Sequence, residues 1–590
     1  MTEIYIDKTA VVLPKEFSFK TFDENPRYTK NGSYSLDIDL SLNNVINSRL
    51  YRHINRIHSR AIFTGRSVII KADGNKEFVG KEVILGFTNS TVRIQIIAGN
   101  SDLNFNLRED KIRNLNLGSV TYKFISDPDT NPDNFWIADN EPFEVYLNQR
   151  YPSKNFIHAP FYAEDAGQFC NQWLYTNQSA PGIPTLGPNG LFVAQPYISA
   201  IINKIIKYYG YTVEHNDIEL DQGFSELYIV HGYNTNEYAK MLPDWTVKEF
   251  FEQIEKLFNC TLIVNPQNQA VSIVFNNQYF KTSDTNVLKM IDAYECENNP
   301  ENTIDYSNAN IGYDLDDCLY YRYARLDKRI DNMALSDSYV DAADLYAKIN
   351  DAADIQRHIK IFSGPLGDFI SRKIPDSTYF LAQRVNEMKD LSQNQKEDLD
   401  ITFKIMPAPM KQVIDYVYDM GSVDNYPYWN QYPVVLKSEK YDQANLVNID
   451  DVLTQELELP EEKLQSKMYL AVYTGMQLID YVNDVPSYSL PGIPMSYTTY
   501  LASYFDGRQE PRFFQSGGAL KLERLKDTKY NSDEVDTTRK FRISFIANKN
   551  IDIRNFFNFN NKLYACIRLE KTFNHKGLNQ IFSGDFYPLK

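Results

Sequence analysis

The segment "LPDWTVKEFFEQIEKLFNCTLIVNPQNQAVSIVF", residues 242–275, predicts a helix followed by a β-hairpin. Its apolar residues recur at the 3, 4, 7 spacing of one helical face: Val247, Phe250, Phe251, Ile254, Leu257 and Phe258. Thr246 and Glu249 have the spacing of a capping box at the start of that helix. The β-branched run that follows, and the alternation after a turn at 265–269, predict two strands. We interpret the segment as an α-β-β packing unit, with no catalytic signature beside it.

The composition limits the classes of protein to consider. A chain of 590 residues is expected to form three to five domains, at about 100–200 residues per domain. The formal net charge of −16 works against unassisted binding to nucleic acid or to an anionic membrane. Aromatic residues make up 14% of the chain, which suits either many strands with wide subunit contacts or a compositional habit of the source organism. The composition does not choose between these two explanations.

The cysteines and the termini indicate where the chain is made. The five cysteines are scattered and form no C-x-x-C pair, so neither a disulfide framework nor a zinc site is predicted. The first residues are acidic and polar, which is not typical of a signal peptide, and no run approaches the ~20 apolar residues of a membrane span. We expect a protein that is made in a reducing cytoplasm and stays soluble.

The amino-terminal region, residues 1–125, predicts a small β-barrel-like domain. Ser33 to Leu42 alternates as one strand with Tyr34, Leu36, Ile38 and Leu40 on the same side, and a helix is predicted from Val45 to Ile57. Asp73-Gly74 supplies the turn of a hairpin. Val92, Ile94 and Ile96 are then expected to face the core of this domain.

The remaining 465 residues predict three further regions. Residues 126–300 predict an α/β inserted domain, with a loop at 127–134 and a second helix from Ile198 that stops at Gly210. Residues 301–400 predict a helix-rich linking region, because 337–399 is charged and helical in pattern. Residues 401–590 predict a strand-rich domain that ends in barrel hairpins, with a turn at Ser583-Gly584. The expected fold class is α+β multidomain, with two β-barrel-like domains on either side of the inserted domain and the helical segment.

The closing strand has a pattern of its own. Leu563, Ala565, Ile567 and Leu569 alternate with Tyr564, Cys566, Arg568 and Glu570, which predicts a strand with one apolar face.

No motif in the sequence predicts a catalytic, cofactor or metal site. His53 and His58 lie one residue off the spacing that places two ligands on one helical face, so they are interpreted as polar surface residues. The stretch 127–134 resembles the start of a calcium loop but has Pro132 where the loop requires glycine. The acidic cluster of Asp314, Asp316 and Asp317 contains paired carboxylates, yet such clusters arise by chance in an acidic chain. We therefore predict that the protein is not an enzyme.

One aromatic stretch is a candidate binding surface. The sequence "NYPYWNQYP" from Asn425 to Pro433 places Tyr426, Tyr428, Trp429 and Tyr432 close together in what is interpreted as a loop. Loop aromatics either stack on a sugar ring or anchor a contact between subunits. Both interpretations make this a binding protein, and the sequence leaves both open.

The order of elements resembles the baseplate hub or tail-tip proteins of tailed phages, a family also found in contractile injection systems. The segments "FSFKTFDENPRYTKNGSYSLDIDL", "FVGKEVIL" and "STVRIQIIAG" look like the first hub barrel. The 242–275 unit and "PYISAIINKIIKYYGYTV" are similar to the inserted domain, and "NNKLYACIRLEKTFNHKGLNQIFSGDFY" looks like a closing barrel hairpin. The use of Asn, Tyr and Asp also looks like that of phages of gut Bacteroidetes.

The resemblance implies a homotrimer in the virion tail, assembled in the host cytoplasm. Two β domains per subunit would alternate into a six-fold-like ring that joins the tail tube to a central spike or fibre and contacts other baseplate proteins. DNA would pass through the lumen without specific binding. Two alternatives remain at this stage: a glycan-binding tail protein that uses Trp429, and a tail-associated cell-wall hydrolase.

Overall fold

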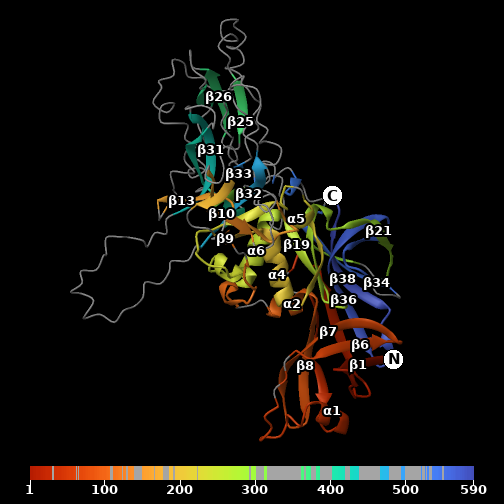
Figure 1. The fold of residues 1–590 in the computed structure, drawn as a ribbon. Coiled ribbons are helices and arrows are strands. Elements are labelled where there is room, and N and C mark those ends of the chain that lie inside the picture. Colours follow the sequence, from red (N-terminus) through yellow and green to blue (C-terminus); the bar gives the residue numbers. More distant parts are fainter. Residues whose placement is uncertain are drawn as a thin grey trace, which may run out of the picture.

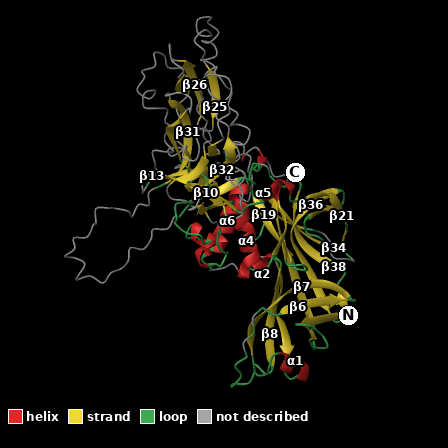
Figure 2. Cartoon of the chain, in the orientation of Figure 1, coloured by secondary structure: helices red, strands yellow, loops and turns green. Residues whose placement is uncertain are grey.

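The computed structural model describes three long stretches, residues 1–121, 149–299 and 535–590, each with short gaps. Shorter described pieces lie between them: 124–127, 131–137, 311–314, parts of 360–385, 401–418, 425–436, 466–477, 493–497, and a few residues of 520–530. Strands dominate. Helices α2 (Asn100–Asn106), α4 (Ile198–Tyr208), α5 (Asp217–Leu220) and α6 (Val247–Phe258) gather beside the sheets near the centre of the molecule, and α1 (Val45–Leu50) lies at the far end of the amino-terminal sheet (Figure 1, Figure 2).

The amino-terminal region is a curved antiparallel sheet that alternates buried and exposed residues. Its strands are β1 (Thr2–Ile6), β2 (Thr9–Ala10), β3 (Ser18–Glu24), β4 (Ser33–Ser35), β5 (Ile38–Ser41), β6 (Ser67–Ala72), β7 (Asn75–Phe87) and β8 (Thr91–Ala98). The hairpin between β6 and β7 turns at Asp73 and Gly74, which both have positive φ, as predicted. Val92, Ile94 and Ile96 are fully buried in the core of this sheet.

Two local predictions in this region are wrong. Helix α1 covers only Val45–Leu50, because Arg52 and His53 adopt the left-handed conformation and end it. The segment Ser33–Leu42 is not one strand: Ser35 is buried while Leu36 is exposed, so the buried side changes between β4 and β5. Alternation of residue types in the sequence does not reveal where the buried side of a strand changes, because the pattern of side chains contains no signal for the change.

The carboxy-terminal region forms a second antiparallel sheet. Its strands are β34 (Arg539–Ile546), β35 (Asn555–Phe559), β36 (Lys562–Asn574), β37 (Gly577–Leu578) and β38 (Ile581–Pro588). Three strands from the end of the predicted inserted domain join it: β21 (Lys281–Val287), β22 (Lys289–Met290) and β23 (Glu295–Asn298). The boundary predicted at residue 300 therefore does not separate the two regions.

Strand β36 differs from the predicted pattern of one apolar face. Its pairing with β38 shifts between Cys566 and Arg568, and residues 564–567 are buried on both faces. Ala565 and Ile567 pack in one cluster, while Tyr564 and Cys566 pack in another. Leu563 is exposed. Before the bulge, the even-numbered Tyr564 and Cys566 face the carboxy-terminal core; after it, the odd-numbered Leu569 faces the same core.

The predicted turn at Ser583-Gly584 is also wrong, because both residues lie inside β38. A Cβ on Gly584 would lie 2.8 Å from the ring of Phe586 and 3.0 Å from the carbonyl oxygen of Arg568. The glycine is therefore explained by close packing rather than by a reversal of the chain.

The middle region contains the α-β-β unit as predicted. Helix α6 (Val247–Phe258) is capped by the Thr246 hydroxyl, which accepts from the Glu249 N–H at 3.1 Å, and it ends at Asn259 with φ of 43°. The Glu249 carboxylate does not close a capping box but binds Lys404 at 2.8 Å. Strands β19 (Cys260–Asn265) and β20 (Ala270–Phe275) form the hairpin, and β17 (Thr212–Asn216) adds a parallel strand.

Helix α4 (Ile198–Tyr208) is followed by Gly210 with positive φ, as predicted. The core of this middle region draws on distant segments. Strand β18 (Leu227–Val230) pairs with β32 (Met468–Gln477), which also pairs with β29 (Ile405–Pro407). Residues after 401 thus belong partly to the core of the middle region, and not to a separate domain that begins there.

Three predicted loops or helices are strands. Within 301–400, where a helix-rich region is predicted, the described elements are β24 (Ile311–Tyr313), β25 (Lys360–Gly364), β26 (Gly367–Lys373) and β27 (Phe380–Val385). The rest of the predicted helical segment, 337–359 and 386–399, lies outside the described residues. The last three form an antiparallel sheet, because "SGPLGD" supplies a turn signal and the flanking residues alternate. The stretch around 127–134 contributes to a hairpin of β9 (Phe124–Asp127) and β10 (Asn131–Ile137). Residues 425–433 lie in β31 (Asn425–Val435), paired with β30 (Met410–Tyr418).

Candidate functional site: the joined sheet and its charged face

The two ends of the chain form one continuous sheet. Strand β3 pairs with β36 from Ser18 opposite Asn574 to Glu24 opposite Arg568. The sheet therefore runs from β1 through β8, β3 and β36 to β34 without interruption (Figure 1). The two barrel-like ends are not independent domains in one subunit, since they share a backbone ladder.

A phenylalanine of the carboxy-terminal strand completes the amino-terminal core. Phe573 is fully buried, and its ring stacks on that of Phe19 with centroids 5.4 Å apart. On the same pair of strands the Lys571 ammonium binds the Asp23 carboxylate at 2.7 Å, with only 5% of the lysine side chain exposed. Side chains and backbone together fix the position of one end against the other.

Asn25 connects all three regions. It is fully buried, its backbone N–H donates to the Ile567 carbonyl at 2.8 Å, and its side-chain amide donates to the Cys566 carbonyl at 2.7 Å. Its side-chain oxygen accepts from the hydroxyl of Tyr279 at 2.6 Å, and Tyr279 follows the α-β-β unit. Burial raises the pKa of the Tyr279 phenol, so this hydroxyl remains a donor. One residue therefore satisfies partners from the two ends and the middle of the chain.

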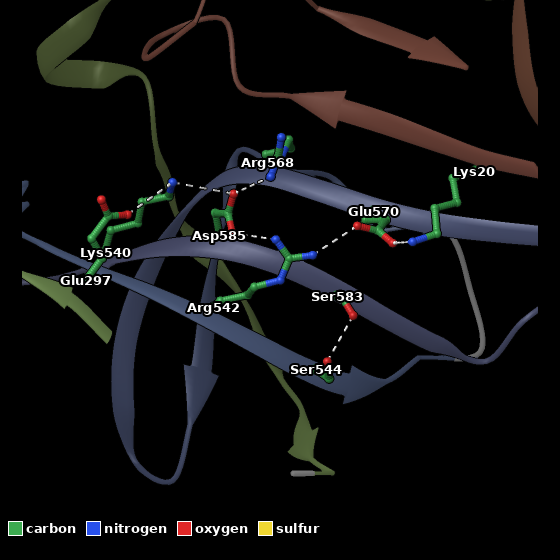
Figure 3. A network of polar contacts seen from close by, with 9 residues as sticks. All are labelled: Lys20, Glu297, Lys540, Arg542, Ser544, Arg568, Glu570, Ser583 and Asp585. Atoms are coloured by element: carbon green, nitrogen blue, oxygen red, sulfur yellow. Dashed lines mark hydrogen bonds and ion pairs between the residues drawn. The ribbon is translucent and has the colours of Figure 1, made fainter. Parts of the chain in front are cut away.

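The face of the joined sheet opposite its carboxy-terminal core carries a network of ion pairs (Figure 3). Asp585 lies at its centre, 2.8 Å from the Arg568 guanidinium and 3.9 Å from both the Arg542 guanidinium and the Lys540 ammonium. Glu570 binds Lys20 at 2.6 Å and Arg542 at 3.3 Å. The network spans five strands, from β23 through β34, β38 and β36 to β3.

Strand periodicity explains why these residues share one face. The charged residues lie two apart on β34 (Lys540, Arg542) and on β36 (Arg568, Glu570), and the adjacent residues Ile543, Leu569 and, beside Asp585 on β38, Phe586 lie in the core. Cations and carboxylates alternate from strand to strand, so opposite charges face one another. Among the drawn residues every Lys and Arg has a carboxylate within 4.0 Å (Figure 3).

The arrangement is suited to a structural surface rather than to acid–base or nucleophilic chemistry. The Ser544 and Ser583 hydroxyls on this face hydrogen-bond to each other at 2.9 Å. Cys566 on β36 is fully buried, and burial raises the pKa of its thiol well above the usual value. A buried thiol that stays protonated is a poor nucleophile. The carboxylates of the network are already bound to cations.

The middle region holds two buried histidines whose pKa values are strongly lowered. Burial lowers the pKa of His158 to about 3 and that of His231 to about 4. The His231 ring nitrogen Nε2 lies 2.8 Å from the Ala194 carbonyl oxygen, while Nδ1 accepts from the Tyr233 N–H at 3.2 Å. These contacts fix the tautomer with the proton on Nε2. Both rings are neutral core groups.

The residues singled out from the sequence lie in different places. All six members of the predicted apolar helix face, Val247, Phe250, Phe251, Ile254, Leu257 and Phe258, are buried in the core of the middle region. Tyr432 is also buried, with its ring 5.0 Å from that of Phe169, so it does not belong to an exposed platform. The side chains of Tyr426, Tyr428 and Trp429 lie outside the described residues, although their backbone belongs to β31.

The remaining candidates do not converge on a site. His53 lies in a turn, where its Nδ1 is 2.8 Å from the Ser48 hydroxyl. Asp314 is 3.4 Å from the Lys467 ammonium, and Asp316 and Asp317 lie outside the described residues. In the described part of the chain no three His, Cys, Asp or Glu side chains are grouped as a metal site. No described helix combines the length and apolar character that crossing a membrane requires.

The charged face and Asn25 are functional candidates that the sequence patterns missed. The signal for the face was present as alternating charges in the closing strands, such as Lys540 and Arg542 or Arg568 and Glu570. Their pairing depends on the order of strands in the sheet, which brings β3 beside β36 across more than 500 residues. Asn25 also accepts from the nearby Arg27 N–H at 3.1 Å, but the partners that join the regions, Cys566, Ile567 and Tyr279, are distant in sequence, so no local pattern identifies them.

Comparisons with known proteins give only remote similarities. No family model and no curated protein matches the chain. Among solved structures, a 43 kDa tail protein of prophage MuSo2 from Shewanella oneidensis is 7% identical, with a TM-score of 0.32, over 99% of this chain and 97% of that one. A tail protein from Neisseria meningitidis MC58 is 5% identical, with a TM-score of 0.30, over 99% and 95%. Both neighbours are described as tail proteins, and TM-scores this low do not establish a shared fold.

Proposed function

We propose that this protein is a structural component of a phage tail, and that it forms the hub ring on the tail axis. The observation that carries the proposal is the β3–β36 joint, which makes the two strand-rich ends of one chain a single rigid sheet. A chain of this kind contributes two neighbouring segments to a ring. Three chains then supply six segments, so the ring would match the tail tube on one side and a three-fold spike or fibre on the other.

The charged face suits the wall of a passage for DNA. Unpaired Lys and Arg side chains bind the phosphate backbone and release its counterions, whereas cations already bound to carboxylates have less to gain. Lys20, Arg542 and Arg568 each contact a carboxylate within 3.3 Å. A wall of this composition lets a polyanion pass without retaining it, and the chain's net charge of −16 acts in the same direction.

Electron microscopy of the native particle, with an antibody fragment against this chain, tests the proposal. The expected result is three labels around the tail axis, next to the tube. Labels at the tail fibres only, or none on the particle, would overturn the hub assignment. Sedimentation of the purified chain gives an independent result, for which a trimer is expected and a monomer at all concentrations would contradict the ring.

A further inference from the structure

Opposite charges are concentrated in two segments of this chain. Residues 40–72 contain six Lys and Arg residues and no Asp or Glu, in a protein whose net charge is −16. Residues 290–321 contain eight Asp and Glu residues and no Lys or Arg. Segregation of this kind is unexpected in a chain with mixed charge elsewhere. Of the eight acidic residues, Glu295, Glu297 and Asp314 lie among the described residues.

The basic segment forms an exposed tip with apolar residues. Arg49, Arg56 and Arg60 are exposed and make no ion pair within the described part of the chain, and the side chain of Ile57 beside them is 97% exposed. Asn55 donates to the Asn89 carbonyl at 2.7 Å, which holds the loop after α1 against the turn between β7 and β8.

The contact between Asn55 and Asn89 places further apolar side chains of α1 and β7 at the same end of the sheet. Val45, Ile46, Leu85 and Phe87 are all exposed there. The base of the tip is rigid: the buried Arg66 binds Glu82 at 2.6 Å and donates to the Leu50 carbonyl at 3.0 Å. We call this surface the basic tip. Exposed aliphatic and aromatic residues next to arginines that form no ion pair in the described part of the chain are typical of a protein-docking surface.

The acidic segment begins on the edge strand of the carboxy-terminal sheet. All four residues of β23 are exposed, and the strand pairs with β34 by one edge only among the described strands. Glu295 and Glu297 lie on this strand, and the exposed Ile291 and Tyr294 precede them. Glu297 lies 3.8 Å from the Lys540 ammonium, whereas Glu295 makes no ion pair among the described residues, so Glu295 is the carboxylate of this edge that is open to a new cation. We call this surface the acidic edge. It has the apolar content of the basic tip and the opposite charge.

The two surfaces lie apart within one chain. The tip surrounds α1 at one extremity of the sheet, whereas β23 borders β34 at the other end of the strand order (Figure 1). We propose that the basic tip of one copy docks on the acidic edge of a second copy. This inference rests on the proposed ring, because it names the contact between its subunits. A contact between two different surfaces is heterologous, and repetition of such a contact closes a ring when the rotation allows it.

A second copy fits this surface better than nucleic acid does. Phosphate contacts use cations but gain nothing from Ile57, Phe87 or Leu85, and the net charge of −16 repels a polyanion at low ionic strength. A second copy supplies carboxylates and apolar side chains together. Attraction between exposed charges is screened beyond about 10 Å at 0.1 M salt, so the contact is expected to weaken as salt rises.

Charge reversal tests the proposal by sedimentation equilibrium of the full chain at 50 and 500 mM NaCl. R56E/R60E and E295K/E297K should each weaken self-association by at least about tenfold at 50 mM NaCl. The control K76E/K207E changes the charge by the same amount at exposed sites away from the tip and should leave association unchanged. The quadruple variant R56E/R60E/E295K/E297K restores complementary charges and should recover the oligomer, which a mere folding defect would not allow.

Crosslinking supplies a second readout. Cys296 lies on the acidic edge and is exposed, whereas the other free cysteines in the described part of the chain are buried. A bismaleimide should therefore join His58→Cys on the tip to Cys296 of another copy, and Lys76→Cys should give no such product.

The outcomes separate this inference from the proposed function. An oligomer that is insensitive to both double variants, with no His58→Cys crosslink, overturns the docking contact but leaves the ring intact. A monomeric wild type overturns both. Binding of a 30-base-pair duplex by the monomer, lost in R56E/R60E, would show instead that the tip is a nucleic-acid surface.

Discussion

Replacing Phe573 by alanine tests whether the two ends of the chain are one energetic unit. Phe573 belongs to the carboxy-terminal strand β36, yet it is fully buried in the amino-terminal core against Phe19. Truncation of a buried phenylalanine costs about 3–5 kcal/mol through lost transfer free energy and the cavity left behind. The stacked pair adds about 0.5–1.5 kcal/mol beyond the buried area. We therefore expect the amino-terminal strands to lose about 3–5 kcal/mol of stability from a change near the carboxy terminus.

Native-state hydrogen exchange is the suitable measurement, because a chain with several regions does not unfold in a single two-state step. Amides of β3 and β6 should exchange faster in Phe573→Ala. The matched control is Phe557→Ala, which removes an equally buried ring from the carboxy-terminal core only. The faster amide exchange caused by Phe557→Ala should be confined to the strands from β34 to β38. A double-mutant cycle with Phe19→Ala should give a coupling of about 0.5–1.5 kcal/mol.

Two results would refute this reasoning. If protection of β6 changes by less than about 0.5 kcal/mol in Phe573→Ala, the ring does not stabilise the amino-terminal core. If the substitutions at residues 19 and 573 are additive within the same margin, the stacked geometry contributes nothing beyond buried area.

Two further predictions concern pH and close packing, and both are measured by native-state hydrogen exchange. Burial holds the pKa of His158 at about 3 and that of His231 at about 4, so the unfolded middle region binds protons below about pH 6.5 that the folded region does not bind. The free energy of opening of the middle-region amides should therefore fall by about 1.4 kcal/mol per histidine for each unit of decrease in pH, and His231→Gln should halve this slope between pH 6.5 and 5; an unchanged slope would contradict the expectation. Gly584→Ala should lower the protection of the β38 amides by about 1–3 kcal/mol, since its Cβ would lie 2.8 Å from the ring of Phe586, whereas Gly86→Ala, with nothing within 4 Å, should be nearly neutral for the β7 amides; equal effects of the two alanine variants would contradict this.

The middle region was the most predictable from sequence because its signals are local. The helix Val247–Phe258 has a hydroxyl at its start and a left-handed Asn259 at its end, and both boundaries agree with the structure. The α4 boundary at Gly210 follows the same rule. Capping depends on residues within one turn of each helix end, so a single sequence contains the information.

The strand regions were less predictable because a side-chain pattern does not report pairing. The bulge after Cys566 exchanges the two faces of β36, and the alternation predicted from Leu563 therefore does not hold. Strands β25, β26 and β27 carry charged residues, and the helical prediction for this part of the chain rested on its charged composition, which does not distinguish a strand from a helix. A one-residue shift moves every side chain to the other face, and only the neighbouring strands determine where it occurs.

The candidate site depends on contacts between the two ends of the chain, and this explains why sequence patterns did not find it. Lys20 and Glu570 form an ion pair across 550 positions, and neither belongs to a motif. Their charges are visible in the sequence, but the partner of each charge follows from the strand order β3-β36-β38-β34. Long-range pairing of this kind has no signal within a window of 10 to 20 residues.

The joint between the two ends also affects how strongly copies can associate. Formation of a ring orders each subunit against two neighbours, and every internal motion that must be frozen on assembly reduces the net affinity. Two barrels on a flexible linker would lose that freedom on assembly, whereas the β3–β36 ladder and the buried Asn25 have already removed it within the folded subunit. A basic tip at one end and an acidic edge at the other are then held at a fixed separation. Asn25→Ala should therefore weaken self-association as well as folding, although Asn25 is buried and lies on neither docking surface.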